Sequence, residues 1–379
     1  MRVIVVGGGI GGLAAGIALR RRGHEVQVWE RTTEIGAAGS GLTLWPNGLR
    51  ALDAIGLGDP VRARAMVDTE GGIRDRSGRW LSRTDTAKMA ARHGSVVAVH
   101  RADLFDILRA ALGPDRLRPG VTVTGIEGDR VRYDGGTESA DLVVGADGLR
   151  STVRAAVCPG ARPPRYAGYT AWRMITRPLP PLREGGEIWG SGERFGVVPL
   201  PDGRVYLFGV ADAPEGGHRP GGEFAEVRRR FGAWPDPIGR LLTEVPPEAV
   251  LRHDIYELPD LPSFVRGRVA LLGDAAHAMT PNLGQGANQA LEDAITLAAV
   301  LDGRDVAAEL RRYDSLRRPR TRALAHRSRL IGSVAQWSWP PAVLARDTGL
   351  RLMPGWAMLR AFDSAVGWTA PDCSQTPAQ

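Results

Sequence analysis

Residues 1–31 read MRVIVVGGGIGGLAAGIALRRRGHEVQVWER, and the order of elements in this stretch decides the fold. Val3–Val6 is a run of β-branched residues without polar alternation, which is typical of a strand buried on both faces of a parallel sheet. Glycines in the pattern G-x-G-x-x-G follow it, and Leu13–Arg22 is expected to form the next helix. A second strand, Glu25–Trp29, ends at Glu30. The stretch therefore predicts a dinucleotide-binding βαβ unit.

Each glycine of the turn has a separate expected task. Gly7 permits the tight turn, Gly9 lets the backbone approach a pyrophosphate, and Gly12 lets the helix pack closely on the strand. The Glu30 carboxylate can accept hydrogen bonds from both hydroxyls of an adenosine ribose, and it would repel a 2′-phosphate. The expected ligand is therefore FAD or NAD rather than NADP. A glycine-rich turn without a ligand is the alternative.

A second cofactor motif is expected in residues 268–294, RVALLGDAAHAMTPNLGQGANQALEDA. The apolar run Val269–Leu272 ends at Gly273-Asp274. Pro281 follows, and a helix is expected to begin within Gly284–Asn288. A carboxylate at a strand end and free N–H groups at a helix start suit a polyhydroxylated, partly anionic ligand, because helix N-termini attract negative charge. Together with the N-terminal motif, this segment predicts a large, extended cofactor.

A third block lies between these two motifs. The expected strand Asp141–Val144 is followed by a turn in which Asp147 is a candidate partner of a ribityl or pyrophosphate-linked group. Ser151 is a candidate cap of the helix that follows. The expected helix Arg101–Leu112 begins with Arg101, a candidate cation for the pyrophosphate. The alternatives are an ordinary turn aspartate and a surface arginine.

The middle of the chain predicts antiparallel strands whose inner face covers the cofactor. These strands are Tyr169–Thr176, Glu187–Gly190, Phe195–Leu200 and Arg204–Val210. Arg173 shares a face with Tyr169 by the period of two, and Trp172 points the other way. Arg173 is a candidate clamp for a carboxylate or phenolate, with a solvent-facing arginine as the equal alternative. His253 is a candidate general base, and Tyr256 lies near it in sequence.

Three further features carry weaker expectations. Trp45 and Asn47 are candidates to lie near the cofactor ring, with core packing as the alternative, and His277 is expected to be a structural hydrogen-bonding residue. The C-terminal tryptophans are expected to be buried in a helical cap, with a cover over the substrate entrance or a subunit contact as alternatives. They are Trp337, Trp339, Trp356 and Trp368.

Composition excludes several classes of protein. The net charge of +7 comes almost entirely from arginines dispersed among acidic residues, with Lys88 as the single lysine, so nucleic-acid binding is not expected. Cys158 and Cys373 give neither a metal site nor a disulfide framework, and they fit a reducing cytoplasm. No run approaches the roughly 20 apolar residues that span a bilayer. The N-terminal glycines and arginines argue against a secretory signal.

The three ordered motifs resemble those of class A flavoprotein monooxygenases, the aromatic hydroxylases built like p-hydroxybenzoate hydroxylase. Gly7–Gly12 matches the GxGxxG motif of this family, Asp147-Gly148 its DG motif and Gly273-Asp274 its GD motif. The match extends from residue 1 to about residue 320. Among the members, the chain resembles the short salicylate-, hydroxynicotinate- and urate-hydroxylase-like enzymes most.

The resemblance implies an α/β fold. It consists of a Rossmann-like FAD-binding domain of the GR2 type, an inserted antiparallel-sheet substrate domain and a C-terminal helical segment. The FAD-binding domain is expected in residues 1–70, 95–165 and 255–300, and the substrate sheet in residues 71–94 and 166–254. The helical region is expected in residues 301–379.

The resemblance also implies which residues hold the cofactor. Pro281 would lie against the isoalloxazine, and Gly284–Asn288 would follow its pyrimidine edge, where a helix N-terminus stabilises the negative charge of reduced flavin. No metal ligand is expected. The full expected FAD set is Gly7, Gly9, Gly11, Gly12, Glu30, Arg31, Arg101, Asp147, Asp274, Pro281, Gly284, Gln285, Gly286, Ala287 and Asn288.

The implied activity is that of an FAD-dependent monooxygenase. NADH or NADPH would reduce FAD, and a flavin C4a-hydroperoxide would insert one oxygen atom of O₂ into an electron-rich aromatic or heteroaromatic molecule, by hydroxylation or epoxidation. An FAD-dependent reductase or dehydrogenase without oxygen insertion is the main alternative. A halogenase and a flavin-binding protein without turnover are further alternatives, although the halogenase motif W-x-W-x-I-P is absent. A monomer and a homodimer are both compatible with the sequence.

Overall fold

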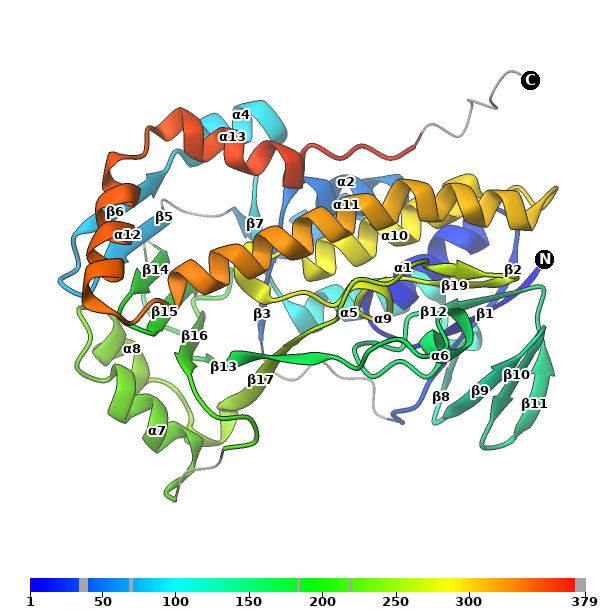
Figure 1. Ribbon diagram of the computed structural model, residues 1–379, viewed down its shortest axis with the longest axis horizontal. Coiled ribbons are helices and arrows are strands. Elements are labelled where there is room, and N and C mark those ends of the chain that lie inside the picture. The colour runs from blue at the N-terminus through cyan, green and yellow to red at the C-terminus, as the bar shows by residue number, and fades with distance from the viewer. Residues whose placement is uncertain (34–39, 68–70, 183–184, 218–219, 372–379) are drawn as a thin grey trace.

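The N-terminal βαβ unit forms part of a six-stranded sheet. The computed structural model describes residues 1–33, 40–67, 71–182, 185–217 and 220–371 (Figure 1). Strand β1 (Arg2–Val6) leads into helix α1 (Ile10–Arg21), and β2 (Glu25–Glu30) pairs with β1 in parallel. The helix begins three residues before the expected Leu13, because Gly9 is its N-cap. Its residues from Ile10 to Leu19 are all buried, as expected for a helix covered by protein on every side.

A six-stranded sheet collects strands from distant parts of the chain in the order β18-β19-β12-β1-β2-β8. Strand β12 (Leu142–Gly145) pairs in parallel with β1 on one side and with β19 (Val269–Leu271) on the other. The carboxyl ends of these strands therefore meet at one edge, which is where open α/β sheets bind ligands. The outer strands are β8 (Leu117–Pro119) and β18 (Val265–Arg266).

The second large sheet has seven strands in the order β17-β13-β16-β15-β14-β5-β6. All its pairings are antiparallel except one, because β5 pairs with β14 in parallel. β5 and β6 precede the other strands of this sheet by about 80 residues or more, so their direction is not set by the hairpins that join the later strands. The strands are β5 (Gly71–Asp75), β6 (Trp80–Thr84), β13 (Arg165–Ile175), β14 (Gly186–Trp189), β15 (Glu193–Pro199), β16 (Val205–Asp212) and β17 (Leu251–Glu257).

Several strand boundaries differ from expectation by one or two residues, and the start of β13 differs by four. β13 begins at Arg165 rather than Tyr169, because Gly168 has a positive φ of 91° and the pairing register shifts between Tyr166 and Thr170. This irregularity interrupts the alternation that marks a strand in the sequence. β17 continues through Glu257, so the expected domain division at residue 254 falls inside a strand.

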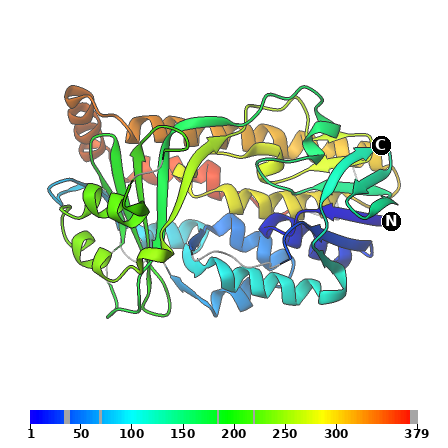
Figure 2. The same ribbon diagram turned by 90° about the horizontal axis from the view of Figure 1, so that it is seen from below.

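The two faces of the seven-stranded sheet have different partners. Trp172 and Met174 of β13 belong to a core that α7 (Gly222–Phe231) and α8 (Ile238–Thr243) complete on one face. Tyr169 and Arg173 lie on the opposite face by strand alternation, as the sequence predicts. In Figure 2 this sheet, in green, stands at the end of the molecule opposite to the N-terminus.

Long helices connect the two sheets. Helix α10 (Gly286–Val300) packs on α1, and α11 (Val306–Ala335) runs across the molecule from the six-stranded to the seven-stranded sheet (Figure 1). α12 (Pro340–Leu352) and α13 (Gly355–Val366) follow it. No helix of the described residues is long and apolar enough to cross a membrane.

Shorter elements complete the structure. They include two three-stranded sheets, one in the order β3-β7-β4 and the other in the order β11-β10-β9. The elements are β3 (Gly41–Leu44), α2 (Pro46–Ala54), α3 (Gly58–Arg62), β4 (Ala65–Val67), α4 (Thr86–His93), β7 (Val97–His100), α5 (Arg101–Leu112), β9 (Val123–Glu127), β10 (Arg130–Tyr133), β11 (Gly136–Ser139), α6 (Val153–Val157) and α9 (Asp274–His277). Short 3₁₀ turns lie at Pro114–Arg116, Pro247–Ala249 and Pro281–Leu283.

The expectation of buried C-terminal tryptophans is wrong for three of the four. Trp337, Trp339 and Trp356 are 39%, 68% and 67% exposed. Only Trp368 packs against the main core as a partly buried residue. The segment before α12, α12 itself and the start of α13 therefore expose large apolar side chains.

Candidate active site

The glycines after β1 form an open cradle at the carboxyl edge of the six-stranded sheet. Gly7 has a φ of 111°, and a Cβ there would lie 2.3 Å from the carbonyl oxygen of Ala146. A Cβ on Gly12 would lie 1.9 Å from the carbonyl oxygen of Gly7. Around a Cβ built on Gly9, by contrast, no heavy atom of the described protein lies within 4 Å. Gly7 and Gly12 thus serve the packing of the chain, whereas Gly9 borders space that a ligand can fill.

Glu30 is held in place at the end of β2. Its Oε2 accepts a hydrogen bond from the backbone N–H of Gly8 at 2.7 Å, and its Oε1 accepts from the N–H and hydroxyl of Thr32 at 3.0 and 2.8 Å. A carboxylate oxygen has more than one acceptor site, so both oxygens can still accept from a ribose diol. Arg31, the next residue, is exposed.

Asp147 lies at the end of β12 beside this cradle. Its Oδ2 accepts hydrogen bonds from the N–H groups of Thr152 and Val153 at 2.7 and 3.1 Å, while its buried Oδ1 has no partner within the described part of the chain. An unpartnered buried carboxylate oxygen is costly and calls for a polar ligand. The N-cap residue of α6 is Thr152, but the Ser151 hydroxyl, expected as a cap, does accept from the N–H of Arg154 in the first turn at 2.9 Å.

Arg154 ties the second and third motifs together, and sequence reasoning missed it. Its guanidinium donates to the carbonyl oxygens of Leu149 and Ala275, at 2.8 and 3.1 Å. Burial lowers the pKa of Arg154, and the charge of Asp147 opposes this effect. A basic residue after a turn aspartate gives only a weak signal in the sequence, because its partners are backbone groups distant along the chain.

The GD motif and the start of α10 close the other side of the cradle. Gly273 has a φ of 58° and is followed by Asp274, which is exposed at the strand edge. A Cβ on Gly286, the first residue of α10, would meet no described heavy atom within 4 Å. The Asn288 side chain instead braces the protein: its Oδ1 accepts from the N–H of Trp45 at 3.0 Å, and its Nδ2 donates to the Gly284 carbonyl at 2.9 Å. The backbone N–H groups at the helix start remain for an anionic group.

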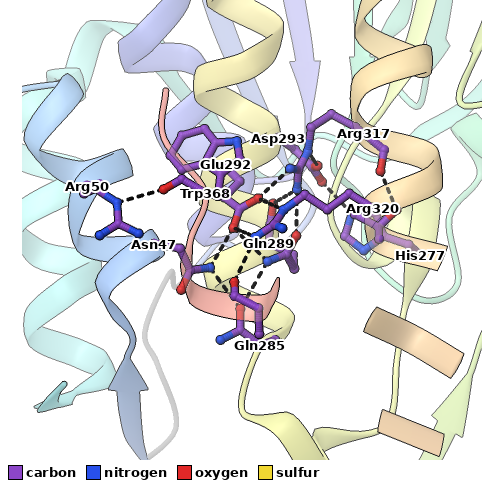
Figure 3. A network of polar contacts seen from close by, with 12 residues as sticks. Asn47, Arg50, His277, Gln285, Gln289, Glu292, Asp293, Arg317, Arg320 and Trp368 are labelled. Atoms are coloured by element: carbon purple, nitrogen blue, oxygen red, sulfur yellow. Dashed lines mark hydrogen bonds and ion pairs between the residues drawn. The ribbon is translucent and has the colours of Figure 1, made fainter. Parts of the chain in front are cut away.

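Behind α10 lies a buried network of charged and amide side chains (Figure 3). Arg317 of α11 is 1% exposed and donates to Asp293 Oδ1 at 2.6 Å and to the Gln289 side chain at 2.8 Å. It also forms an ion pair with Glu292. Burial alone would lower the pKa of Arg317, but the charges of Asp293 and Glu292 raise it well above its usual value. Arg317 therefore stays charged and holds α10 to α11.

The same network reaches the cofactor side of α10. Asn47 of α2 is fully buried and donates to Gln285 at 2.9 Å and to Glu292 at 2.6 Å. His277 contacts Asp293 Oδ2 at 2.5 Å, so the structural role expected for this histidine is confirmed. Burial alone would raise the pKa of Asp293, but His277 and Arg317 lower it below its usual range. The network sets the position of the first turn of α10 from behind.

A second group of side chains faces the cradle from the seven-stranded sheet. Burial and then the nearby charge of Arg173 lower the pKa of Arg101, and the charge of Asp274 opposes them. Arg101 therefore lies between the cofactor edge and the sheet. His253 pairs with Ala171, two positions from Arg173 on the same face of β13. His253 is exposed as a residue, yet loss of hydration and then the charges of Arg173 and Arg101 lower its pKa.

Tyr256 is not brought to this group. It lies an odd number of positions from His253 on β17, and its hydroxyl donates to the Glu215 carboxylate. Its ring meets Tyr166 edge to face, with 5.8 Å between centroids. The structure thus assembles Arg101, Arg173 and His253 and leaves Tyr256 on the other side of the strand.

The chain matches the family model described as an FAD binding domain over residues 1–175 and 261–328. It is 38% identical to the aurachin C monooxygenase/isomerase of Stigmatella aurantiaca over 362 residues, 93% of this chain and 94% of that one. It is 35% identical to an FAD-dependent urate hydroxylase of Klebsiella pneumoniae over 347 residues, 87% of this chain and 89% of that one. The chain belongs to the FAD-dependent class A flavin monooxygenases.

A solved structure agrees with this assignment. Klebsiella pneumoniae HpxO, complexed with FAD and uric acid, matches this monooxygenase with a TM-score of 0.90 and 32% identity over 97% of this chain and 96% of that one. The open space at Gly9 and Gly286 and the unpartnered oxygen of Asp147 fit an extended, phosphate-bearing cofactor such as FAD. Among the described residues no cluster of three His, Cys, Asp or Glu side chains is placed to hold a metal ion.

The monooxygenase has a further buried arginine near the segment after Pro281 that the sequence interpretation missed. Arg194 of β15 is 2% exposed, and its guanidinium donates to Asn282. Asn282 in turn donates to the hydroxyl of Tyr169 at 3.0 Å. This contact joins the sheet to the segment that follows Pro281. Alternation along β15 would place Arg194 on one face, but only strand pairing shows that this face looks toward the cofactor edge.

An aromatic floor lies on the same face of the sheet. A Cβ on Gly196 would lie 2.0 Å from the ring of Phe208, so this ring lies flat over the glycine. Tyr206 lies beside Phe208, with 5.8 Å between ring centroids and 38° between ring planes. Flat aromatic surface next to arginines suits a planar ligand that carries negative charge.

Proposed function

We propose that this monooxygenase uses NADH or NADPH and O₂ to oxygenate a planar, electron-rich aromatic or heteroaromatic compound that binds as an anion. One observation carries the anionic character: within the described residues neither Arg101 nor Arg173 forms an ion pair, although the two guanidiniums share one side of the site. Two neighbouring cations that no carboxylate of the described residues contacts directly favour negative ligands. Arg101 is assigned to the cofactor side and Arg173 to the substrate.

The side chains around the site have separate tasks in this proposal. Arg173 holds the oxygen anion of the substrate, and the floor of Phe208 and Tyr206 orients its ring. The lowered pKa of His253 keeps its imidazole neutral near pH 7, so that it can accept a proton from a substrate hydroxyl. Bound FAD supplies the redox and oxygen chemistry. The N-terminus of α10 favours negative charge at its end of the site.

The relatives support the ring class. One is named for urate and another for aurachin C, and both are oxygenases of small molecules by name. We assign the reaction to the cytoplasm, in keeping with the free buried thiol of Cys158. Cys373 lies outside the described residues. A monomer or a homodimer serves the proposed reaction equally.

The test is oxidation of NADH and of NADPH by the FAD-loaded protein with a panel of urate, 4-quinolones, hydroxybenzoates and their uncharged analogues. An ionisable heteroaromatic compound should accelerate oxidation and gain one atom of ¹⁸O from ¹⁸O₂. Acceleration without ¹⁸O in the product would favour the reductase alternative. Equal rates with charged and uncharged analogues would contradict the anionic assignment.

Arg173→Met should raise KM for the anionic substrate and leave FAD affinity unchanged. A hydrogen bond to a charged group contributes about 1.5–3 kcal/mol, so KM should rise roughly 10- to 150-fold. Arg177→Met is the matched control, because Arg177 is exposed just beyond the end of the same strand. Steady-state kinetics on both variants, with FAD titration, check this. An unchanged KM in Arg173→Met would remove Arg173 from the substrate site.

The pH profile of kcat/KM should show an acid limb that depends on His253. The pKa of His253 is lowered from 6.5, so the neutral, proton-accepting imidazole predominates at pH 6.5 and above and is lost only as the pH falls below the lowered pKa. The free energy of unfolding should also fall as the pH drops, because the folded state binds a proton at His253 less readily than the unfolded state does. His253→Asn should remove the limb, and His326→Asn, at an exposed histidine, should keep it. A limb that persists in His253→Asn belongs to another group.

A further inference from the structure

Helix α12 buries an arginine and exposes two leucines, which is unusual for a surface helix. Arg346 is 4% exposed and donates to the carbonyl oxygens of Ala335 and Gly190, at 3.1 and 2.9 Å. Its guanidinium also lies over the ring of Trp189, 5.5 Å from the centroid. Leu344 and Leu352 are 65% and 76% exposed. A helix that only covers a core buries its leucines and exposes its arginine.

The exposed apolar residues continue on both sides of α12. We call the set the apolar end surface; it consists of Trp337, Trp339, Leu344, Leu352, Met353 and Trp356. Figure 1 places α12 at the end of the molecule farthest from the N-terminus, with α13 running back along the upper edge. A concentration of large apolar side chains in one region of a surface marks an interaction site, whereas scattered ones need no explanation.

This surface carries no free charge. From Leu330 to Leu359 the sequence has only three charged residues, Arg346, Asp347 and Arg351. Arg346 pairs with Asp347 at 2.8 Å, and Arg351 pairs with Asp75 of β5 at 2.6 Å. All three charges are therefore paired within the protein, and the large apolar side chains that the segment exposes are tryptophan, leucine and methionine.

Cations border the surface. Arg360 is exposed one helical turn after Trp356, and Arg83 is exposed on β6, the strand on which α12 and α13 pack. The whole chain carries a net charge of +7. A second copy of the chain would bring like charges together around such a contact, whereas an anionic surface complements them. Tryptophans bordered by arginines are also the composition that membrane–water interfaces favour.

We propose that the apolar end surface docks this protein on an anionic lipid bilayer. Trp337, Trp339 and Trp356 enter the headgroup layer, the leucines of α12 lie on the acyl boundary, and the bordering arginines meet lipid phosphates. The contact is peripheral, because the helices involved have 13 and 12 residues and lie along the surface. It brings the enzyme to compounds that partition into membranes.

Co-sedimentation of the FAD-loaded full chain with vesicles tests the proposal. The protein should bind vesicles of phosphatidylcholine with phosphatidylglycerol, bind pure phosphatidylcholine more weakly, and lose binding as salt screens the charges. Trp339→Ser/Trp356→Ser should lower the partition coefficient about tenfold or more. Because both residues are exposed, flavin content and the melting temperature should stay as in the wild type.

Leucine variants supply the matched control. Leu352→Ser should weaken vesicle binding, while Leu316→Ser, at a leucine that is 43% exposed in the first half of α11, should not. Failure of the wild type to bind anionic vesicles would overturn the proposal, as would equal binding by the double tryptophan variant. A dimer in light scattering that Leu352→Ser dissociates, without vesicle binding, would assign the surface to a second copy instead.

Discussion

Gly9→Val is expected to give a protein that folds without FAD but binds FAD roughly 5- to 150-fold more weakly. The added side chain meets no described atom of the protein within 4 Å at its Cβ, so the apo structure has room for it. The same space is where the second glycine of the motif lets a pyrophosphate approach the backbone. Forcing extra methyl groups against a bound group costs about 1–3 kcal/mol, and each 1.4 kcal/mol is a factor of about ten in affinity.

Gly12→Ala is the contrasting variant. Its Cβ would lie 1.9 Å from the carbonyl oxygen of Gly7, which is backbone and cannot move without displacing β1 from α1. Gly12→Ala should therefore lower the melting temperature of the apo protein, whereas Gly9→Val should not. Thermal melting of both apo proteins and titration with FAD separate the two effects. Wild-type FAD affinity in Gly9→Val would mean that the pyrophosphate does not pass this glycine.

Arg317→Met should destabilise the protein by about 3–5 kcal/mol, the range found when one partner of a buried ion pair is removed. The variant leaves the carboxylates of Asp293 and Glu292 in the interior, where both are 0% exposed. Glu292 keeps a second cation, because Arg320 donates to its Oε2 at 2.7 Å. Within the described residues Asp293 keeps only the contact with the His277 ring and the hydrogen bond from the Gly273 N–H, so the loss should be greatest at that residue.

The neighbouring residue supplies the control for this prediction. Arg318 pairs with Asp314 at 3.0 Å on the same helix, but its side chain is 33% exposed. A solvated pair of this kind contributes about 0–1 kcal/mol, so Arg318→Met should stay within that range. Chemical denaturation of the apo proteins, followed by tryptophan fluorescence, measures both losses. Equal losses in the two variants would show that the buried network contributes no special stability.

The position of this network links stability to function. Gln285, at the start of α10, accepts from Asn47 at 2.9 Å, and Asn47 also donates to Glu292, the partner of Arg317. A loss of Arg317 is therefore transmitted to the helix start that faces the cofactor. FAD affinity should fall along with stability in Arg317→Met, in contrast to Arg173→Met, where FAD affinity is retained.

Much of the cofactor side of the fold could be predicted from local sequence. The run Val3–Val6, the glycine turn and the acid at Glu30 lie within one short segment, and their structure depends on residues close to them in the chain. The same holds for α5, whose bounds Arg101–Leu112 agree with the expectation. Asp147 and Asp274 could be placed at the same edge as well, since parallel strands bring their carboxyl ends together.

The sequence by itself thus determined the βαβ unit, the three motifs and the edge at which they meet. Only the tertiary structure decided that Arg317 pairs with Glu292 and Asp293, that His253 rather than Tyr256 joins Arg173, and that Arg346 is buried while Leu352 is exposed. The physical reason is the range of the interactions. Turns, caps and periodicity act between near neighbours, whereas strand pairing and buried charges join residues from separate elements, whose faces become defined only when the elements pack.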